Sequence, residues 1–217
     1  MSLLKLNSKY CKLSPEQRLY NIDQPIIGLT GGIATGKSTA SSIMKSMGAS
    51  IIDADGLVKR IYQSDDTKKL VKELAPESIF NSEIDFKKLR ERFFSDSTVK
   101  SRLETHIYSH MPQKFKEAIE KLPKKSLIIY DVPLLFEKSI DKLVDVSVLI
   151  YAPKEVQVTR LVKRDGIDPK LAQTILANQM PIEDKKKLAQ FTIENTSDIK
   201  YLDNKVREFL GAVSSKL

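Results

Sequence analysis

The chain has 217 residues, a formal net charge of +8 and a hydrophobic fraction of 41%. This length fits one α/β domain with inserted segments, and it is long enough to bury a substantial core. No apolar run is long enough to cross a bilayer and the N-terminus lacks the apolar stretch of a secretory signal, so we expect no membrane partner. The single cysteine, Cys11, excludes an intramolecular disulfide and favours a reducing, cytoplasmic location.

The excess of basic residues fits either of two partners, a nucleic acid or a polyanionic small molecule. The lysines are spread along the chain, with short clusters at residues 124–125 and 185–187 that are typical of solvated helix faces. RNA-binding modules carry basic motifs interleaved with aromatic residues, and this sequence has no such motif. We therefore expect no nucleic-acid partner, although the charge alone does not decide the question.

The first third of the chain is predicted to contain an arm, a buried strand and a helix. Residues 1–24 form the arm, either a short helix or a loosely ordered segment, and we assign it no function. Residues 26–29 are a short run without polar alternation, typical of a strand covered on both faces. Residues 39–47 carry an apolar stripe, which predicts a helix that Gly48 ends.

The segment between this strand and this helix carries the phosphate-binding motif G-x-x-x-x-G-K-[ST], as Gly31, Gly36, Lys37 and Ser38. Its glycines let the backbone curl so that several N–H groups point into one concavity at a helix N-terminus, which attracts phosphate oxygens. Lys37 is expected to reach the β- and γ-phosphates, and the Ser38 hydroxyl to complete the shell of a Mg²⁺ ion. The alternative is a glycine-rich turn that only starts a helix.

Two aspartates, two residues apart, mark the end of the second predicted strand, residues 50–53. Asp53 and Asp55 point the same way if the strand continues through them. Because ligands bind at the carboxyl ends of strands in open parallel sheets, such a carboxylate can accept a proton from an acceptor hydroxyl or hold water around Mg²⁺. The alternative is that Asp55 caps the next helix.

Residues 56–122 are predicted to be mostly helical, with a loop at 76–85 and a helix resuming at residue 89 and reaching residue 110. The arginines and lysines of this helix are expected mostly to face solvent, with one or two facing a bound anion. His106 and His110 have the i,i+4 spacing that suits Zn²⁺, but no glutamate stands at the metalloprotease position beside them. We interpret the two histidines as ordinary helix residues.

Three further strands are predicted, at residues 126–131, 144–151 and 190–194. The first of them ends in Asp131, a position that suits a carboxylate supporting Mg²⁺. The chain then ends in a turn at 195–198 and an amphipathic helix at 199–217.

A pair of helices is predicted between the last two strands, one beginning at residue 153 and one at residues 170–179, followed by a charged helix at 181–188. The pair carries Arg160 and Arg164, and its position is that of a lid whose arginines stabilise charge on a transferred phosphoryl group. The alternative is a surface helix with solvated arginines.

Four stretches together resemble the dephospho-CoA kinase family. They are Gly-Leu-Thr-Gly-Gly-Ile-x-x-Gly-Lys-Ser-Thr (28–39), Ile-Asp-Ala-Asp (52–55), Asp-x-Pro-Leu-Leu-Phe-Glu (131–137) and Arg-Leu-x-x-Arg-Asp (160–165). The resemblance runs from residue 26 to residue 210. It implies a nucleoside-monophosphate-kinase-like fold of the P-loop NTPase type, three layers α/β/α with a five-stranded parallel sheet, a helical substrate-binding region and a lid.

The resemblance also implies how the chain is divided. After the arm (residues 1–24), residues 25–217 form a single P-loop kinase domain. Its core comprises residues 25–55, 123–152 and 188–217, its helical substrate-binding insertion residues 56–122, and its lid residues 153–187. We expect a monomer or a small homo-oligomer.

Roles for individual residues follow from the same resemblance. Asp55 matches the general base that receives the 3′-hydroxyl proton of the dephospho-CoA ribose, and Arg90 matches a residue of the acceptor region. Arg160 and Arg164 match catalytic lid arginines, with Lys37 beside the phosphates, and Ser38 matches the Mg²⁺ ligand, with Asp53 or Asp131 acting through water. The residues implied to bind ATP are Gly31, Gly32, Ile33, Ala34, Thr35, Gly36, Lys37, Ser38, Thr39 and Asn195.

The chain departs from the family pattern at a few positions. Where members read Leu-Glu-x-x-x-His-Pro, this chain has Leu103 and Glu104 followed by Tyr108 and Ser109. Its last strand is preceded by Ala-Gln rather than Ala-Asp, and its N-terminal arm is longer. None of these departures removes a phosphate-transfer group.

The function implied is transfer of the ATP γ-phosphate to dephospho-CoA, with Mg²⁺ as cofactor and ATP and dephospho-CoA as partners. One alternative is a P-loop kinase for another small hydroxyl or nucleotide acceptor. A further alternative, of another class, is a nucleotide-gated protein that uses its basic surface on nucleic acid, which predicts binding that weakens steeply with salt.

Overall fold

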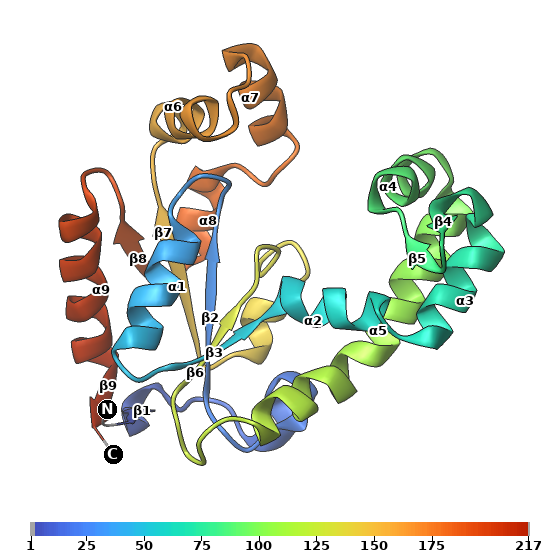
Figure 1. Ribbon diagram of the computed structural model, residues 1–217. Helices are drawn as coiled ribbons and strands as arrows, with labels where there is room; N and C mark the ends of the chain where they lie inside the picture. The colour runs from blue at the N-terminus through green and yellow to red at the C-terminus, as the bar shows by residue number, and fades with distance from the viewer. Residues whose placement is uncertain (1–2, 217) are drawn as a thin grey trace. The chain divides into compact units, whose positions relative to one another are not determined.

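In the computed structural model, which describes residues 3–216, the chain divides into two units (Figure 1). The first unit contains the described residues up to Asp53 and from Leu122 onward, and the second contains Ala54–Lys121. The chain leaves the first unit directly after strand β3 (Ser50–Asp53). Each unit has a hydrophobic cluster of its own.

A five-stranded sheet in the order β3-β6-β2-β7-β8 organises the first unit, and all its neighbouring strands are parallel, as the sequence predicts. The other four strands are β2 (Ile26–Gly31), β6 (Ile128–Asp131), β7 (Val146–Tyr151) and β8 (Phe191–Glu194). Every residue of β2, β6 and β7 is buried, because helices cover both faces of a parallel sheet. Because the five strands are parallel, their carboxyl ends all lie at the same edge of the sheet.

Helices flank this sheet on both faces. Helices α1 (Lys37–Ser46) and α9 (Ile199–Val213) lie side by side over one face, where they share a core with Val148 and Ile150 of β7 (Figure 1). Residues that alternate with these, Leu149 and Tyr151, pack on α8 (Ile182–Leu188), which therefore covers the opposite face.

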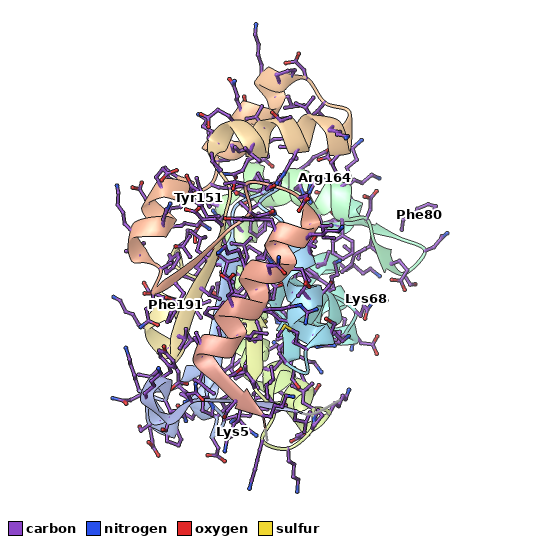
Figure 2. The ribbon with its side chains drawn as sticks, turned by 90° about the vertical axis from the view of Figure 1, so that its left-hand side faces the viewer. Lys5, Lys68, Phe80, Tyr151, Arg164 and Phe191 are labelled. Atoms are coloured by element: carbon purple, nitrogen blue, oxygen red, sulfur yellow. The ribbon has the colours of Figure 1, made fainter. Side chains whose placement is uncertain are left out.

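The first unit also contains the predicted helix pair, α6 (Lys154–Asp165) and α7 (Pro169–Ala177). These two helices pack against each other. A short 3₁₀-helix, η5 (Ile140–Leu143), precedes β7. Figure 2 shows Tyr151 and Phe191 on the edge pair of the sheet, Tyr151 at the end of β7 and Phe191 at the start of β8. A hydrogen bond to Glu183 raises the pKa of Tyr151 to about 12, so its hydroxyl keeps its proton.

The N-terminal arm is built into the first unit, so neither a short helix nor a loose segment describes it. Strand β1 (Leu4–Leu6) pairs antiparallel with β9 (Ser214–Lys216), and both its leucines are buried. The predicted helix at 199–217 is therefore wrong in its last turn, where the chain extends to form β9. Leu217 and residues 1–2 lie outside the described residues.

A buried ion pair anchors the rest of the arm, which contains η1 (Ser8–Tyr10), η2 (Pro15–Gln17) and η3 (Leu19–Asn21). The Arg18 guanidinium donates to both carboxylate oxygens of Asp145, at 2.8 and 3.2 Å. The same carboxylate accepts from the backbone N–H groups of Leu13 and Ile26. Asp145 thus receives the bonds that a buried charge requires, and it ties the arm to the start of β2.

The second unit is mainly helical. Its elements are α2 (Ala54–Tyr62), α3 (Asp65–Leu74), η4 (Pro76–Ser78), β4 (Ile79–Phe80), β5 (Glu83–Ile84), α4 (Phe86–Ser95) and α5 (Ser97–Glu120). The predicted loop at 76–85 contains a small hairpin, and the predicted helix at 89–110 is two helices. The break is Asp96, whose carboxylate caps α5 by accepting from Thr98 and Val99.

No helix among the described residues is long and apolar enough to cross a membrane.

Candidate active site

The phosphate-binding motif lies at the carboxyl edge of the sheet, where β2 ends at Gly31 and α1 begins at Lys37. Gly36, at the N-cap of α1, has φ = 90°, and a Cβ there would lie 2.3 Å from the Asn195 amide nitrogen. Glycine is therefore required at position 36 by conformation and by space. Because no side chain among residues 3–216 is seen to cap α1, its first backbone N–H groups are available to an anion, as the motif predicts.

Side chains from far along the sequence hold the loop in shape. The Asn195 amide, which is buried, donates to the Thr35 carbonyl oxygen at 2.8 Å, and the Thr35 hydroxyl donates to the Gly32 carbonyl oxygen at 2.8 Å. On the other side of the loop, the Ile33 N–H donates to the Gln179 side-chain oxygen at 3.0 Å. The loop is thus braced by the chain after β8 and by the chain after α7.

Lys37 forms an ion pair with Asp131, the last residue of β6. Asp131 is buried and lies next to Leu29 of β2 in the parallel register. The pair therefore places a cation at the carboxyl edge of the sheet, beside the open N-terminus of α1. Opposite charges held this close can reorient when a phosphate competes for the lysine.

Oxygen donors suited to Mg²⁺ gather at the same edge. Ser38 is exposed in the first turn of α1, and Asp53, the last residue of β3, is the register neighbour of Asp131. Hydroxyl and carboxylate oxygens are the ligands that Mg²⁺ prefers. The donor set at this edge therefore fits the ion that the sequence predicts, with Ser38 and the two aspartates as the residues able to hold it.

Asp55 lies beyond the end of its strand. Since β3 stops at Asp53 and α2 begins at Ala54, the strand does not continue through Asp55, so the condition under which Asp53 and Asp55 would point the same way is not met. Asp55 instead occupies the first turn of α2 and is exposed, in the second unit. Arg90 belongs to the same unit and is exposed on α4.

The two arginines of the predicted lid have different surroundings. Arg160 is half-buried, and one of its amino groups lies 3.5 Å from the Asn195 side-chain oxygen and 3.3 Å from the Ser197 carbonyl oxygen. Its other amino group is buried and has no hydrogen-bond partner among the described residues. Arg164, labelled in Figure 2, is exposed and bonds both oxygens of Asp165, and this pairing raises its pKa. Asn195 therefore links Arg160, but not Arg164, to the phosphate loop.

Polar residues at the base of the lid were not predicted from the sequence. Gln157 of α6 is buried and donates to the Ala152 carbonyl oxygen, and its own oxygen would lie 2.7 Å from a Cβ at Gly32. Together with Gln179 and Ile182 it borders a cavity of about 400 Å³ beside the phosphate loop. The predicted helix pair therefore meets the loop through glutamines. Glutamine is not part of a recognised phosphate-binding motif, so the sequence did not indicate these residues.

Lys185 is a second unpredicted residue, because its cluster was expected to face solvent. Its side chain is buried, donates to the Pro133 carbonyl oxygen at 2.9 Å and lies 2.8 Å from the Glu137 carboxylate. The Thr30 hydroxyl donates to the same carbonyl oxygen at 3.0 Å. The ion pair thus fixes α8 to the segment after Asp131. The available signal was the spacing: Lys185 follows the apolar Ile182 by three residues, on the buried face of the helix.

A parallel sheet whose central strand ends in this loop defines a protein of the P-loop type. A shikimate kinase from Bacteroides thetaiotaomicron, 14% identical, shares this fold with a TM-score of 0.50 over 87% of this chain and 97% of the other. The family model described as dephospho-CoA kinase matches residues 25–201. The chain therefore belongs to the dephospho-CoA kinase family.

Relatives and solved structures agree with this membership. A dephospho-CoA kinase of Fusobacterium nucleatum is 38% identical over 87% of this chain and 98% of its own length. A dephospho-CoA kinase structure from Campylobacter jejuni is 28% identical, with a TM-score of 0.66 over 86% of this chain and 95% of that one. A crystal structure from Thermus thermophilus is 29% identical, with a TM-score of 0.78 over 88% and 98%. The family is one of ATP-dependent kinases, so the chain is a phosphotransferase.

Proposed function

We propose that this chain transfers the γ-phosphoryl group of MgATP to the 3′-hydroxyl of dephospho-CoA, giving CoA and ADP. The observation that carries the proposal is the placement of Lys37, paired with Asp131, beside the uncapped N-terminus of α1. This arrangement suits a polyphosphate at the carboxyl edge of the sheet. Family membership supplies the acceptor.

On the donor side, the backbone N–H groups of residues 31–39 and the Lys37 ammonium bind the ATP phosphates. Mg²⁺, when bound through Ser38 and through water on Asp53 or Asp131, neutralises phosphate charge. Arg160 and Arg164 act from the lid on charge that develops on the transferred group. Asn195 holds the loop through Thr35 and stands at the end of β8, where we place the base of ATP.

On the acceptor side, Asp55 orients the 3′-hydroxyl and receives its proton as the oxygen attacks the γ-phosphorus. The bond between the γ-phosphorus and the β-γ bridging oxygen breaks as the new bond forms, and ADP leaves with that oxygen. Asp55 suits this role because it is exposed and lies in the first turn of a helix that directly follows a sheet strand. We assign Arg90 to binding of the acceptor.

The division of labour along the chain is part of the proposal. Residues 56–122 bind the acceptor, residues 153–187 act as the lid, and the rest of residues 25–217 forms the core of a single kinase domain. We propose that the enzyme works in the cytoplasm as a monomer or small homo-oligomer.

A thermal-shift panel tests the acceptor. A ligand that binds only the folded protein raises Tm, so we expect dephospho-CoA to raise Tm with MgADP present, and adenosine, shikimate and single-stranded DNA to leave it unchanged. A shift with one of these other ligands and none with dephospho-CoA would overturn the proposed acceptor.

A further inference from the structure

Three side chains that can bind a metal converge in the second unit, between α3 and α5. Asp66 lies in the first turn of α3, and His106 and His110 lie one turn apart on α5. A carboxylate oxygen of Asp66 and one ring nitrogen of each histidine all lie within 4.8 Å of one another. None of the three has a part in the phosphoryl transfer proposed above. The two histidines lie on either side of Tyr108 and Ser109, the positions where the family motif has its His-Pro.

The frame that carries these residues is packed. Val71 of α3 and Leu103 of α5 belong to one buried cluster, which Leu89 of α4 also joins. His106 and His110 follow Leu103 on the same helix, and their side chains are 18% and 31% exposed. Ligands on packed helices are held in position before the ion arrives, which lowers the cost of binding it.

The contacts of His110 place either a proton or a metal ion beside its ring. Its Nδ1 lies 2.8 Å from the His106 carbonyl oxygen, and a carbonyl oxygen only accepts, so Nδ1 carries a hydrogen. In a neutral ring, Nε2 then presents a lone pair. That atom lies 2.9 Å from the Asp66 carboxylate, which also only accepts. Two acceptors come this close when a proton or a metal ion lies between them, and a backbone carbonyl on Nδ1 is the usual support of a metal-binding histidine.

The distances fit a transition metal. A carboxylate oxygen of Asp66 lies 2.9 Å from His110 Nε2 and 3.7 Å from His106 Nε2. These values bracket the separation of about 3.3 Å between two ligands that each stand about 2.0–2.1 Å from a tetrahedral zinc ion. His106 Nε2 now shares a hydrogen bond of 2.8 Å with the Thr67 hydroxyl, and the ion takes the place of that bond.

The geometry points to a zinc site formed by Asp66, His106 and His110, with its fourth position open to water. Two imidazoles and one carboxylate select zinc and its transition-metal neighbours over Mg²⁺, which prefers oxygen ligands. The site is thus distinct from the Mg²⁺ that accompanies ATP. A bound ion joins α3 to α5 and stabilises the second unit.

Equilibrium dialysis of the untagged, full-length chain against micromolar Zn²⁺, with millimolar Mg²⁺ throughout, tests the site. We expect one zinc ion per chain and a rise in Tm that EDTA reverses. Loss of one of three ligands should weaken binding at least about tenfold, the effect that even supporting residues have on metal sites. Because the sequence has two histidines and one cysteine, His106→Gln and His110→Gln together remove every imidazole.

Asp65→Asn is the matched control for Asp66→Asn, since both aspartates are exposed in the first turn of α3. Circular dichroism in EDTA checks that each variant is folded. Replacement of Zn²⁺ by Co²⁺ reports the ligands, because binding through Cys11 would give a thiolate charge-transfer band. The site is confirmed if both His106→Gln and His110→Gln abolish stoichiometric binding while Asp65→Asn does not. The site is overturned if the wild-type chain binds no zinc at micromolar concentration, or if the folded His106→Gln and His110→Gln variants bind zinc as well as the wild-type chain does. In either case a proton alone joins His110 to Asp66.

Discussion

The two units of the molecule contribute to the proposed reaction in different ways. In the first, the phosphate-binding residues are consecutive, and their surroundings, from Asp131 to Asn195, come from the ends of neighbouring parallel strands. In the second, Asp55 and Arg90 are exposed residues on two different helices. The proposed donor side is thus built on the ends of the sheet strands, whereas the proposed acceptor side depends on individual side chains. Substitutions in the two units should therefore fail in different ways.

The largest expected effect comes from the acceptor side. Asp55→Asn removes the proposed base, so kcat should fall by about 10²–10⁴-fold, the usual contribution of general-base catalysis. Binding of ADP, followed by fluorescence or calorimetry, should be unchanged, because the phosphate loop is intact. Asp65→Asn, with the same change of charge, should keep full activity. Equal turnover in Asp55→Asn would remove the base from the account.

A somewhat smaller loss is expected on the donor side. Lys37→Met removes the cation that faces the phosphates, and kcat should fall by about 10²–10³-fold, as when one preorganised donor is lost at a reaction centre. Here nucleotide affinity should fall too, which distinguishes the donor side from Asp55. Lys45→Met is the matched control, since Lys45 is exposed on the same helix. Unchanged nucleotide binding in Lys37→Met would contradict the role of the loop.

The base of the lid should respond in stability before it responds in chemistry. Lys185→Met leaves Glu137 without its partner in a buried position, and loss of one member of a buried pair costs about 3–5 kcal/mol of unfolding free energy. Urea titration measures the loss. Lys187→Met, on the same helix but with a side chain 76% exposed, should cost less than about 1 kcal/mol. Equal midpoints for the two variants would show that the buried pair does not fix α8.

The smallest effect is expected at the contact between the lid and the loop. Gln179→Ala removes one hydrogen bond to the Ile33 N–H, worth about 0.5–1.5 kcal/mol, so the KM for ATP should change by a few-fold to about tenfold at similar kcat. Gln173→Ala, an exposed glutamine on α7, is the control. If steady-state kinetics give both variants the wild-type KM, Gln179 does not position the loop.

The parts of the molecule that the sequence predicted are those set by local patterns. The positions of the five strands follow from short apolar runs, whereas their parallel arrangement in one sheet came from the family resemblance. The loop follows from the spacing of Gly31, Gly36 and Lys37, since backbone conformation there depends on adjacent residues. The role of Arg90 came from resemblance alone, whereas that of Asp55 came from its position after a strand together with the resemblance. Both roles remain predictions.

The parts that could not be predicted depend on contacts between distant residues. Lys185 is buried because Pro133 and Glu137 lie beside it, and the arm is ordered because Asp145 accepts from Arg18. The end of α9 is another case, because Ser214–Lys216 extends only through pairing with β1. Spacing indicates at most that Lys185 lies on the buried face of its helix and cannot identify its partners, so the lysine cluster and the terminal arm were interpreted by their usual, solvated state.

Release of ADP from MgATP, measured with and without dephospho-CoA and followed by mass spectrometry of the product, tests the central claim most directly. The account predicts ADP formation that depends on dephospho-CoA, together with a product heavier by one phosphate. ADP formation that is independent of dephospho-CoA, or an acceptor whose mass does not change, would contradict it.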